Sequence, residues 1–168
     1  MNSDVLFRLS GAAAIAGGLV RIASSFSLVT DPVTLEWIYD GTDVLLLFGL
    51  IGIYLARAPA LGFLGLASFG VAVAALSFIG GPDADPFGFS TYEQGATTLA
   101  IALIGLSIAW LRGGERPLAP PLFWIATALA GGLFDMLAPP FPGYGLTAAG
   151  VLFGAGFVTA GLPLLRRA

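Results

Sequence analysis

Cysteine, histidine and lysine are all missing from this chain of 168 residues, and all seven basic residues are arginine. Without cysteine there is no disulfide, no thiolate nucleophile and no thiolate metal ligand. Without histidine the chain lacks the commonest general base and the usual ligand of zinc and haem iron. Without lysine no Schiff base to retinal or pyridoxal phosphate can form. The remaining polar groups suit ion pairing and ligand binding, so the sequence predicts no enzyme and no resident metal or cofactor.

Charge is also scarce. Charged residues make up 10% of the chain and apolar residues 57%, with a mean hydropathy of +0.93, whereas a soluble domain has about 25% charged residues. This excludes an ordinary cytosolic enzyme and a disordered chain, and the net charge of −3 argues against a nucleic-acid partner. The composition predicts a multi-pass protein of the lipid bilayer.

Long apolar stretches predict an all-α integral membrane bundle of six transmembrane helices, formed as a single domain by residues 1–168. Each stretch is close to the roughly 20 residues that a spanning helix needs. The N-terminal stretch is not predicted to be a cleaved signal peptide, because Asp4 and Arg21 interrupt the expected charge pattern. The six helices are predicted near residues 6–28, 36–56, 61–80, 91–111, 121–138 and 144–165.

Charges separate to two sides when six spans are assumed. One side receives Arg8, Arg57, Arg112, Arg116, Arg166 and Arg167, beside Asp4 and Glu115. The other receives Asp31, Glu36, Asp40, Asp43, Asp83, Asp85, Glu93 and Asp135, with Arg21 as its only cation. Because positively charged loops stay in the cytoplasm, we expect both termini to be cytoplasmic, in the inner membrane of a prokaryote.

The arginines also suggest an internal repeat. Arg57, Arg112 and Arg166 each close the second helix of a predicted pair, at nearly equal spacing along the chain. One interpretation is three fused helical hairpins of one type, and the other is chance similarity in a six-span protein with positive loops. Small residues four apart would let helices approach closely, within the bundle or against another membrane protein or a second copy. These pairs are Ala12 with Ala16, Ala128 with Gly132, and Gly150 with Gly154.

Arg21, Asp43 and Asp135 fall inside predicted spans at similar depth. A rise of about 1.5 Å per residue places each roughly 20 Å above the cytoplasmic surface, or about 8–10 Å below the external interface. An unpaired charge inside the membrane costs from about 2.5 kcal/mol upward. We therefore expect Arg21 to pair with Asp43, Asp135 or both in a pocket open to the outside. The residues predicted at its mouth are Ser24, Ser25, Tyr39, Asp40, Glu93 and Tyr144.

Three interpretations of this cluster remain open. It is a structural salt bridge that orders the bundle, a binding site for a small polar or cationic solute, or a proton-coupling site in which two acids share one arginine. The three tryptophans, Trp37, Trp110 and Trp124, lie near predicted helix ends. They are predicted to belong to the aromatic belts found at membrane interfaces.

Two segments carry a resemblance. Residues 47–57 (LFGLIGIYLAR) followed by 62–65 (GFLG) resemble a pattern of small uncharacterised prokaryotic multi-pass membrane proteins. The six-span layout is similar to that of the substrate-binding subunits of energy-coupling-factor vitamin importers. In that similarity, residues 12–16 (AAAIA) would correspond to the small-residue face with which those subunits dock their partner.

The leading hypothesis from the sequence is a membrane protein that binds or helps transport a small polar solute through an externally accessible pocket. The alternative is a structural or assembly subunit of a larger membrane complex, with no ligand of its own. The first requires a pocket around the buried charges, and the second requires a protein partner.

Overall fold

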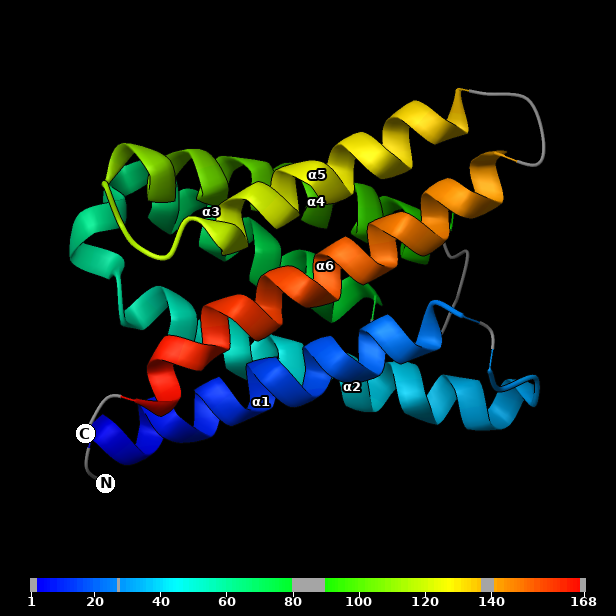
Figure 1. The fold of residues 1–168 in the computed structure, drawn as a ribbon, viewed down its shortest axis with the longest axis horizontal. Helices are drawn as coiled ribbons and strands as arrows, with labels where there is room; N and C mark the ends of the chain where they lie inside the picture. Colours follow the sequence, from blue (N-terminus) through cyan, green and yellow to red (C-terminus); the bar gives the residue numbers. More distant parts are fainter. Residues whose placement is uncertain (1–2, 27, 80–89, 137–140, 167–168) are drawn as a thin grey trace.

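A computed structural model describes residues 3–26, 28–79, 90–136 and 141–166, and these residues form an all-α fold (Figure 1). The chain runs up and down through antiparallel neighbours, as short connections between long apolar helices dictate. Asp83 and Asp85 of the predicted acidic side lie outside the described residues. The helices are α1 (Ser3–Ser24), α2 (Pro32–Leu55), α3 (Ala58–Ile79), α4 (Thr91–Arg112), α5 (Ala119–Asp135) and α6 (Phe141–Leu165).

The helices match the predicted spans, and their ends follow local capping chemistry. Asp31 caps α2 by accepting a hydrogen bond from the Thr34 amide, and Ser90 caps α4 by accepting one from the Glu93 amide. Both are residue types that favour helix starts. The prediction that the first helix reaches residue 28 was wrong, because α1 ends at Ser24. The hydroxyl groups of Ser24, its last residue, and of Ser25, the next residue, both donate hydrogen bonds to the carbonyl oxygen of Arg21 in the final turn.

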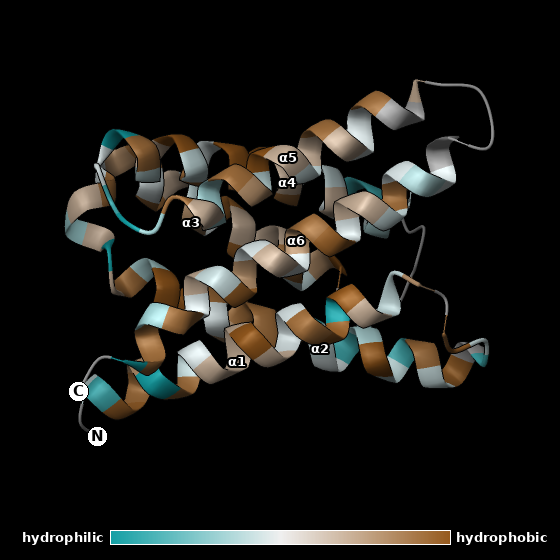
Figure 2. Ribbon diagram, in the orientation of Figure 1, coloured by the Kyte–Doolittle hydropathy of each residue, from teal (hydrophilic) through white to brown (hydrophobic). Residues whose placement is uncertain are grey.

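Five helices in the described part of the chain are long and apolar enough to cross a membrane. The fifth helix in the sequence, α5, is shorter, with 17 residues and a length of about 25 Å. Polar residues gather toward the two ends of the bundle, and apolar residues cover the middle of the helices (Figure 2). The apolar helices therefore indicate a multi-pass membrane protein.

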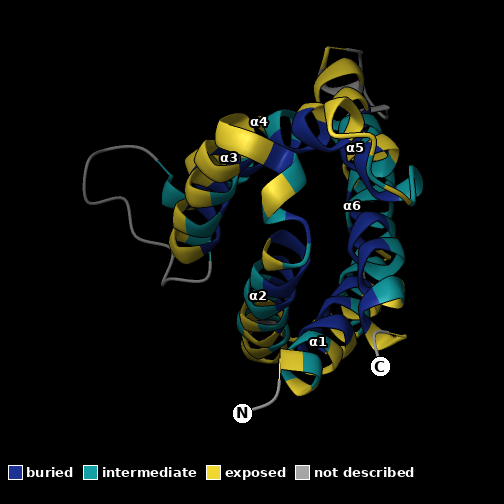
Figure 3. Ribbon diagram, turned by 90° about the vertical axis from the view of Figure 1, so that its left-hand side faces the viewer, coloured by how far each residue is buried: buried dark blue, intermediate teal, exposed yellow. Residues whose placement is uncertain are grey.

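The described helices form a ring in sequence order, closed by extensive packing of α1 against α6 (Figures 1 and 3). Each sequential pair, α1–α2, α3–α4 and α5–α6, packs closely, whereas α2 and α3 touch sparsely. The internal repeat stays a prediction. Both termini lie at one end of the ring (Figure 1). We call this the Arg end, with Arg8, Arg57, Arg112, Arg116 and Arg166, and the opposite one the acidic end, with Asp31, Glu36, Asp40 and Glu93.

Glycines allow α1 and α6 to pack with their backbones in contact. A Cβ atom at Gly18 would lie 2.6 Å from the carbonyl oxygen of Gly154, and one at Gly161 would lie 2.7 Å from that of Gly11. Helices gain little from the hydrophobic effect inside lipid, so close packing of small residues replaces it. The small-residue pair Gly150 and Gly154 predicted from the sequence therefore faces the interior of the bundle, against α1.

Helix α3 is broken near its start. Gly62 has φ +59° and ψ −160°, which separates the first turn, beginning at Ala58, from the rest of the helix. Glycine adopts a positive φ at little cost because it has no Cβ atom. The first turn of α3, before the break, lies against the end of α4, since a Cβ atom at Gly113 would lie 2.6 Å from the carbonyl oxygen of Ala60.

Candidate functional site between α2 and α3

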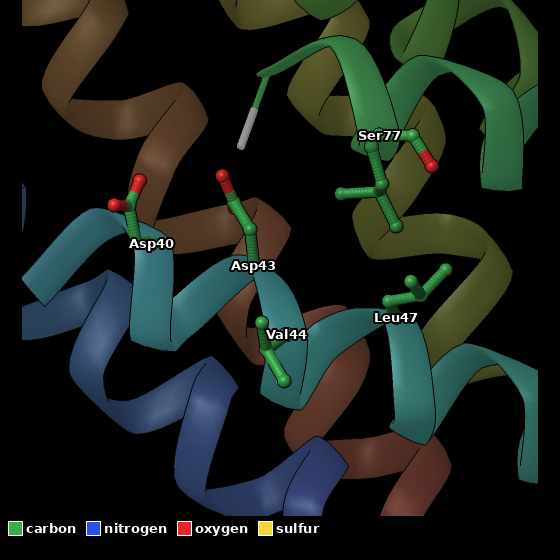
Figure 4. A pocket seen from close by; sticks show the side chains of 6 residues that line it. Asp40, Asp43, Val44, Leu47 and Ser77 are labelled. Carbon is green, nitrogen blue, oxygen red and sulfur yellow. The ribbon is translucent and has the colours of Figure 1, made fainter. Parts of the chain in front are cut away.

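A pocket of about 190 Å³ lies between α2 and α3 in the half of the bundle nearer the acidic end. Asp40 and Asp43 are one helical turn apart on α2, so they share a face. Figure 4 shows both carboxylates on the α2 side of the pocket and Ser77 on the α3 side. The apolar part of the wall consists of Val44, Leu47 and Leu76.

An aromatic ring contact between α2 and α3 lies away from the pocket. Toward the Arg end, the rings of Tyr54 and Phe69 stack with their centroids 4.2 Å apart and their planes 7° from parallel. Over their whole length the two helices touch sparsely, and the pocket lies beside the carboxylates in the half nearer the acidic end. The seam between α2 and α3 is therefore closed by an aromatic stack at one end and hollow beside the carboxylates at the other.

Arg21 of α1 and Asp40 are the charged groups near Asp43, and the predicted ion pair between Arg21 and Asp43 stays a prediction. The Cζ atom of Arg21 lies 5.8 Å from the ring centroid of Tyr39, which is within the range of a cation–π interaction. The predicted neighbourhood of Arg21 and Asp43 therefore includes Asp40 as a second acid. With both carboxyl groups ionised, the three residues leave one negative charge in excess.

The other residues predicted at the mouth of the site, Ser24, Ser25, Glu93 and Tyr144, are not part of the pocket wall. The hydroxyl groups of Ser24 and Ser25 donate hydrogen bonds to the carbonyl oxygen of Arg21. Glu93 and Tyr144 are exposed at the acidic end.

Asp135 is the last residue of α5, and its side chain lies outside the described part of the structure. Within the described residues, α5 contacts α4 and α6 and touches neither α1 nor α2. An ion pair between Arg21 and Asp135 therefore stays a prediction that the helix arrangement does not favour.

A second polar cluster, at the Arg end, was not predicted from the sequence. Arg57 is only 3% exposed, and its Cζ atom lies 4.1 Å from the ring centroid of Trp110. Its Nε atom lies 3.8 Å from a carboxylate oxygen of Glu115 in the α4–α5 connection. The indole N–H of Trp110 donates a hydrogen bond to the carbonyl oxygen of Pro117. We call Arg57, Trp110 and Glu115 the corner cluster.

The prediction that Trp110 and Trp124 belong to an interfacial belt was wrong. Both are buried, at 0% and 1% exposure, and they meet edge to face with their centroids 6.1 Å apart. Trp124 also packs against Phe157 of α6, with their ring centroids 5.4 Å apart. The aromatic rings connect α4, α5 and α6 in the interior. Trp37, at 74% exposure, has the outward position that a belt residue needs.

The sequence analysis did not predict Ser77 and Leu76 as part of the pocket, nor Arg57 as part of a buried cluster. Ser77 and Leu76 lie in a long uncharged stretch, and only the helix arrangement brings them opposite Asp40 and Asp43. Their partners were detectable from the one-turn spacing of the two acids. Arg57 was detectable as a charge but resembled an ordinary loop arginine.

Comparison with known proteins adds no relative to this geometry. No protein-family model, no curated protein and no solved structure matches the chain. The resemblances noted in the sequence stay predictions, and the functional argument depends on the pocket and the helices around it.

Proposed function

We propose that this multi-pass membrane protein binds, and helps to move, a small polar or cationic solute in the pocket between α2 and α3. The observation that carries the proposal is the placement of Asp40 and Asp43 along one hollow of about 190 Å³. Carboxylates inside apolar helices are costly to keep. Binding a positive group there would offset part of that cost.

The pocket chemistry favours a small organic cation over a strongly hydrated metal ion. Its wall combines two carboxylates and a serine with the side chains of Val44, Leu47 and Leu76. An alkylammonium group presents a positive charge together with apolar surface, so it would match both parts of the wall. Arg21 of α1 lies 5.8 Å from the ring of Tyr39 on α2, and its positive charge would offset part of the charge of the two acids when no solute is bound.

The test measures thermal stabilisation of the detergent-solubilised chain by choline, methylammonium and sodium chloride at equal ionic strength. A ligand that binds only the folded state raises the melting temperature. We expect a rise with the organic cations, lost in Asp43→Asn and reduced in Asp40→Asn. Glu36→Gln is the matched control, because Glu36 is an exposed acid of the same helix and is absent from the pocket wall. Equal stabilisation of the native chain and Asp43→Asn would contradict the proposal.

One observation favours a second candidate function, a structural subunit of a larger membrane complex. Ala12 and Ala16 lie four residues apart on α1 and are exposed, whereas Gly11, Gly17 and Gly18 of the same helix pack inside the bundle. Purification from native membranes distinguishes the candidates. The structural role requires a stoichiometric partner that dissociates on Ala12→Leu and Ala16→Leu substitution, and no response to the organic cations.

A further inference from the structure

The bundle divides into two units along the seam that holds the pocket. Among the described residues, α3 packs mainly against α4, while α2, α1, α6 and α5 follow one another through extensive contacts. The α3–α4 unit joins the rest through the sparse α2–α3 seam and through α4–α5. A seam with few contacts is where two rigid parts can move relative to one another at the lowest cost.

At the Arg end, where two residues connect α2 to α3, the corner cluster fastens this connection to the α4–α5 connection. Arg57 belongs to the corner between α2 and α3, and Trp110 and Glu115 belong to the corner between α4 and α5. The backbones also meet there, since a Cβ atom at Gly113 would lie 2.6 Å from the carbonyl oxygen of Ala60. An ionic contact, a cation–π contact and a backbone contact thus tie the same two corners together.

Each of these corners carries a glycine with a positive φ. Gly62 follows Arg57 at φ +59°, and Gly114 precedes Glu115 at φ +67°. A Cβ atom at either position would have no neighbour within 4 Å, so crowding does not explain the glycines. Their backbone conformation does, and both lie in short segments where a rotation of one corner against the other would be absorbed.

We propose that the corner cluster is a latch that holds the α2–α3 corner against the α4–α5 corner. Its release lets the α3–α4 unit rotate about these two corners, which exposes the buried face of α4 beside Trp110 and widens the pocket between α2 and α3 on the side away from the two-residue connection. Rotation of one group of helices against another around a fixed site is how many transporters expose that site to each side in turn. The use of the latch in solute movement rests on the proposed function, whereas its mechanical role does not.

The absence of cysteine allows a clean test, because a single introduced thiol reports accessibility. Ser107 is fully buried, one turn before Trp110 on α4, and Ser107→Cys is nearly isosteric. The full chain in detergent is labelled with a water-soluble methanethiosulfonate reagent. We expect labelling to accelerate about tenfold with Arg57→Ala, which removes both the cation–π and the ionic interaction, and about threefold with Glu115→Gln, which removes the ionic one alone. Arg112→Ala, which removes an exposed arginine of the same end, is the matched control.

Equal labelling rates in Ser107→Cys alone, with Glu115→Gln and with Arg57→Ala would overturn the latch. Acceleration by Arg112→Ala to the same degree would also overturn it, because the effect would then belong to the charge of the whole end. Circular dichroism identifies any variant that fails to fold, and Glu115→Gln and Arg57→Lys then carry the test. If the latch variants accelerate labelling but choline never stabilises the chain, the latch stands and the solute proposal fails. The reverse result removes the latch alone.

Discussion

Two arginines illustrate the contrast between the two ends of the bundle. Arg57 at the Arg end is buried against the face of an indole ring and beside a carboxylate. Arg21, in the half nearer the acidic end, is half-buried, with a tyrosine ring at 5.8 Å and an acid in electrostatic range. Hydropathy treats the two residues alike. The difference shows that residues from distant parts of the chain decide whether an arginine is buried in the packing or stays partly exposed.

The lengths of the connections explain part of this contrast. Two residues, Ala56 and Arg57, separate α2 from α3, and six residues, 113–118, separate α4 from α5. Short connections limit how far two helix ends can separate, so the corners at the Arg end stay in contact. The two-residue connection joins α2 and α3 at the Arg end, and the pocket between these two helices lies in their other half, nearer the acidic end.

The largest expected effect comes from removing a tryptophan at each end. Trp110→Ala deletes a fully buried ring that contacts Arg57 and Trp124. It should lower the free energy of unfolding by about 3–5 kcal/mol. Trp37 is 74% exposed, so Trp37→Ala should change it by about 0.5 kcal/mol or less. Denaturation in sodium dodecyl sulfate, followed by circular dichroism, measures both. Similar losses in the two variants would mean that the Arg end is not the more tightly packed one.

A pair of glycines sharpens the comparison with a smaller effect. Gly113→Ala would force a Cβ atom to within 2.6 Å of the Ala60 carbonyl oxygen, and such overpacking costs about 1–3 kcal/mol. Gly41, inside α2 near the acidic end, has no neighbour within 4 Å of a Cβ atom. Gly41→Ala should therefore raise the free energy of unfolding by about 0.5–1 kcal/mol, because alanine favours the helix. The same denaturation measurement applies, and the opposite ordering of the two variants would refute the packing difference.

Much of the fold was predictable from the sequence, because it follows from local patterns. Apolar length predicted each helix, and the up-and-down order then placed both termini at one end. The helix starts at Pro32 and Thr91 follow capping residues that local chemistry recognises. The length of α5 was predicted closely, but the helix begins two residues and ends three residues earlier than the predicted 121–138.

The sites were only partly predictable, because side chains meet through tertiary packing. Depth counting along each helix depends only on the rise per residue, and the pairing of Arg21 with Asp43 that it suggested stays a prediction. It also grouped Asp135 with them, although α5 packs on the far side of α6 from α1. Trp110 and Trp124 looked interfacial because they lie near helix ends, but neighbouring helices cover those ends. The depth of a residue in the membrane follows from its position along one helix, whereas its side-chain contacts depend on which helices are neighbours.

The smallest predicted effect concerns the start of α2 at the acidic end, where the hydrogen bonds between Asp31 and Thr34 are exposed to solvent. The hydroxyl and the amide of Thr34 both donate to the Asp31 carboxylate and lower the pKa of Asp31 below its ordinary value of 3.8. A lowered folded-state pKa stabilises the fold above the ordinary value, and that contribution is lost as pH falls through the lowered pKa. Asp31→Ala should therefore melt at a slightly lower temperature than the native chain at neutral pH. The gap should narrow below about pH 4. Asp31→Asn, which keeps an oxygen to cap the helix, should keep part of the stability but none of this pH dependence. A gap between the native chain and Asp31→Ala that is constant from pH 7 to pH 3 would show that the Thr34 contacts at the acidic end do not form.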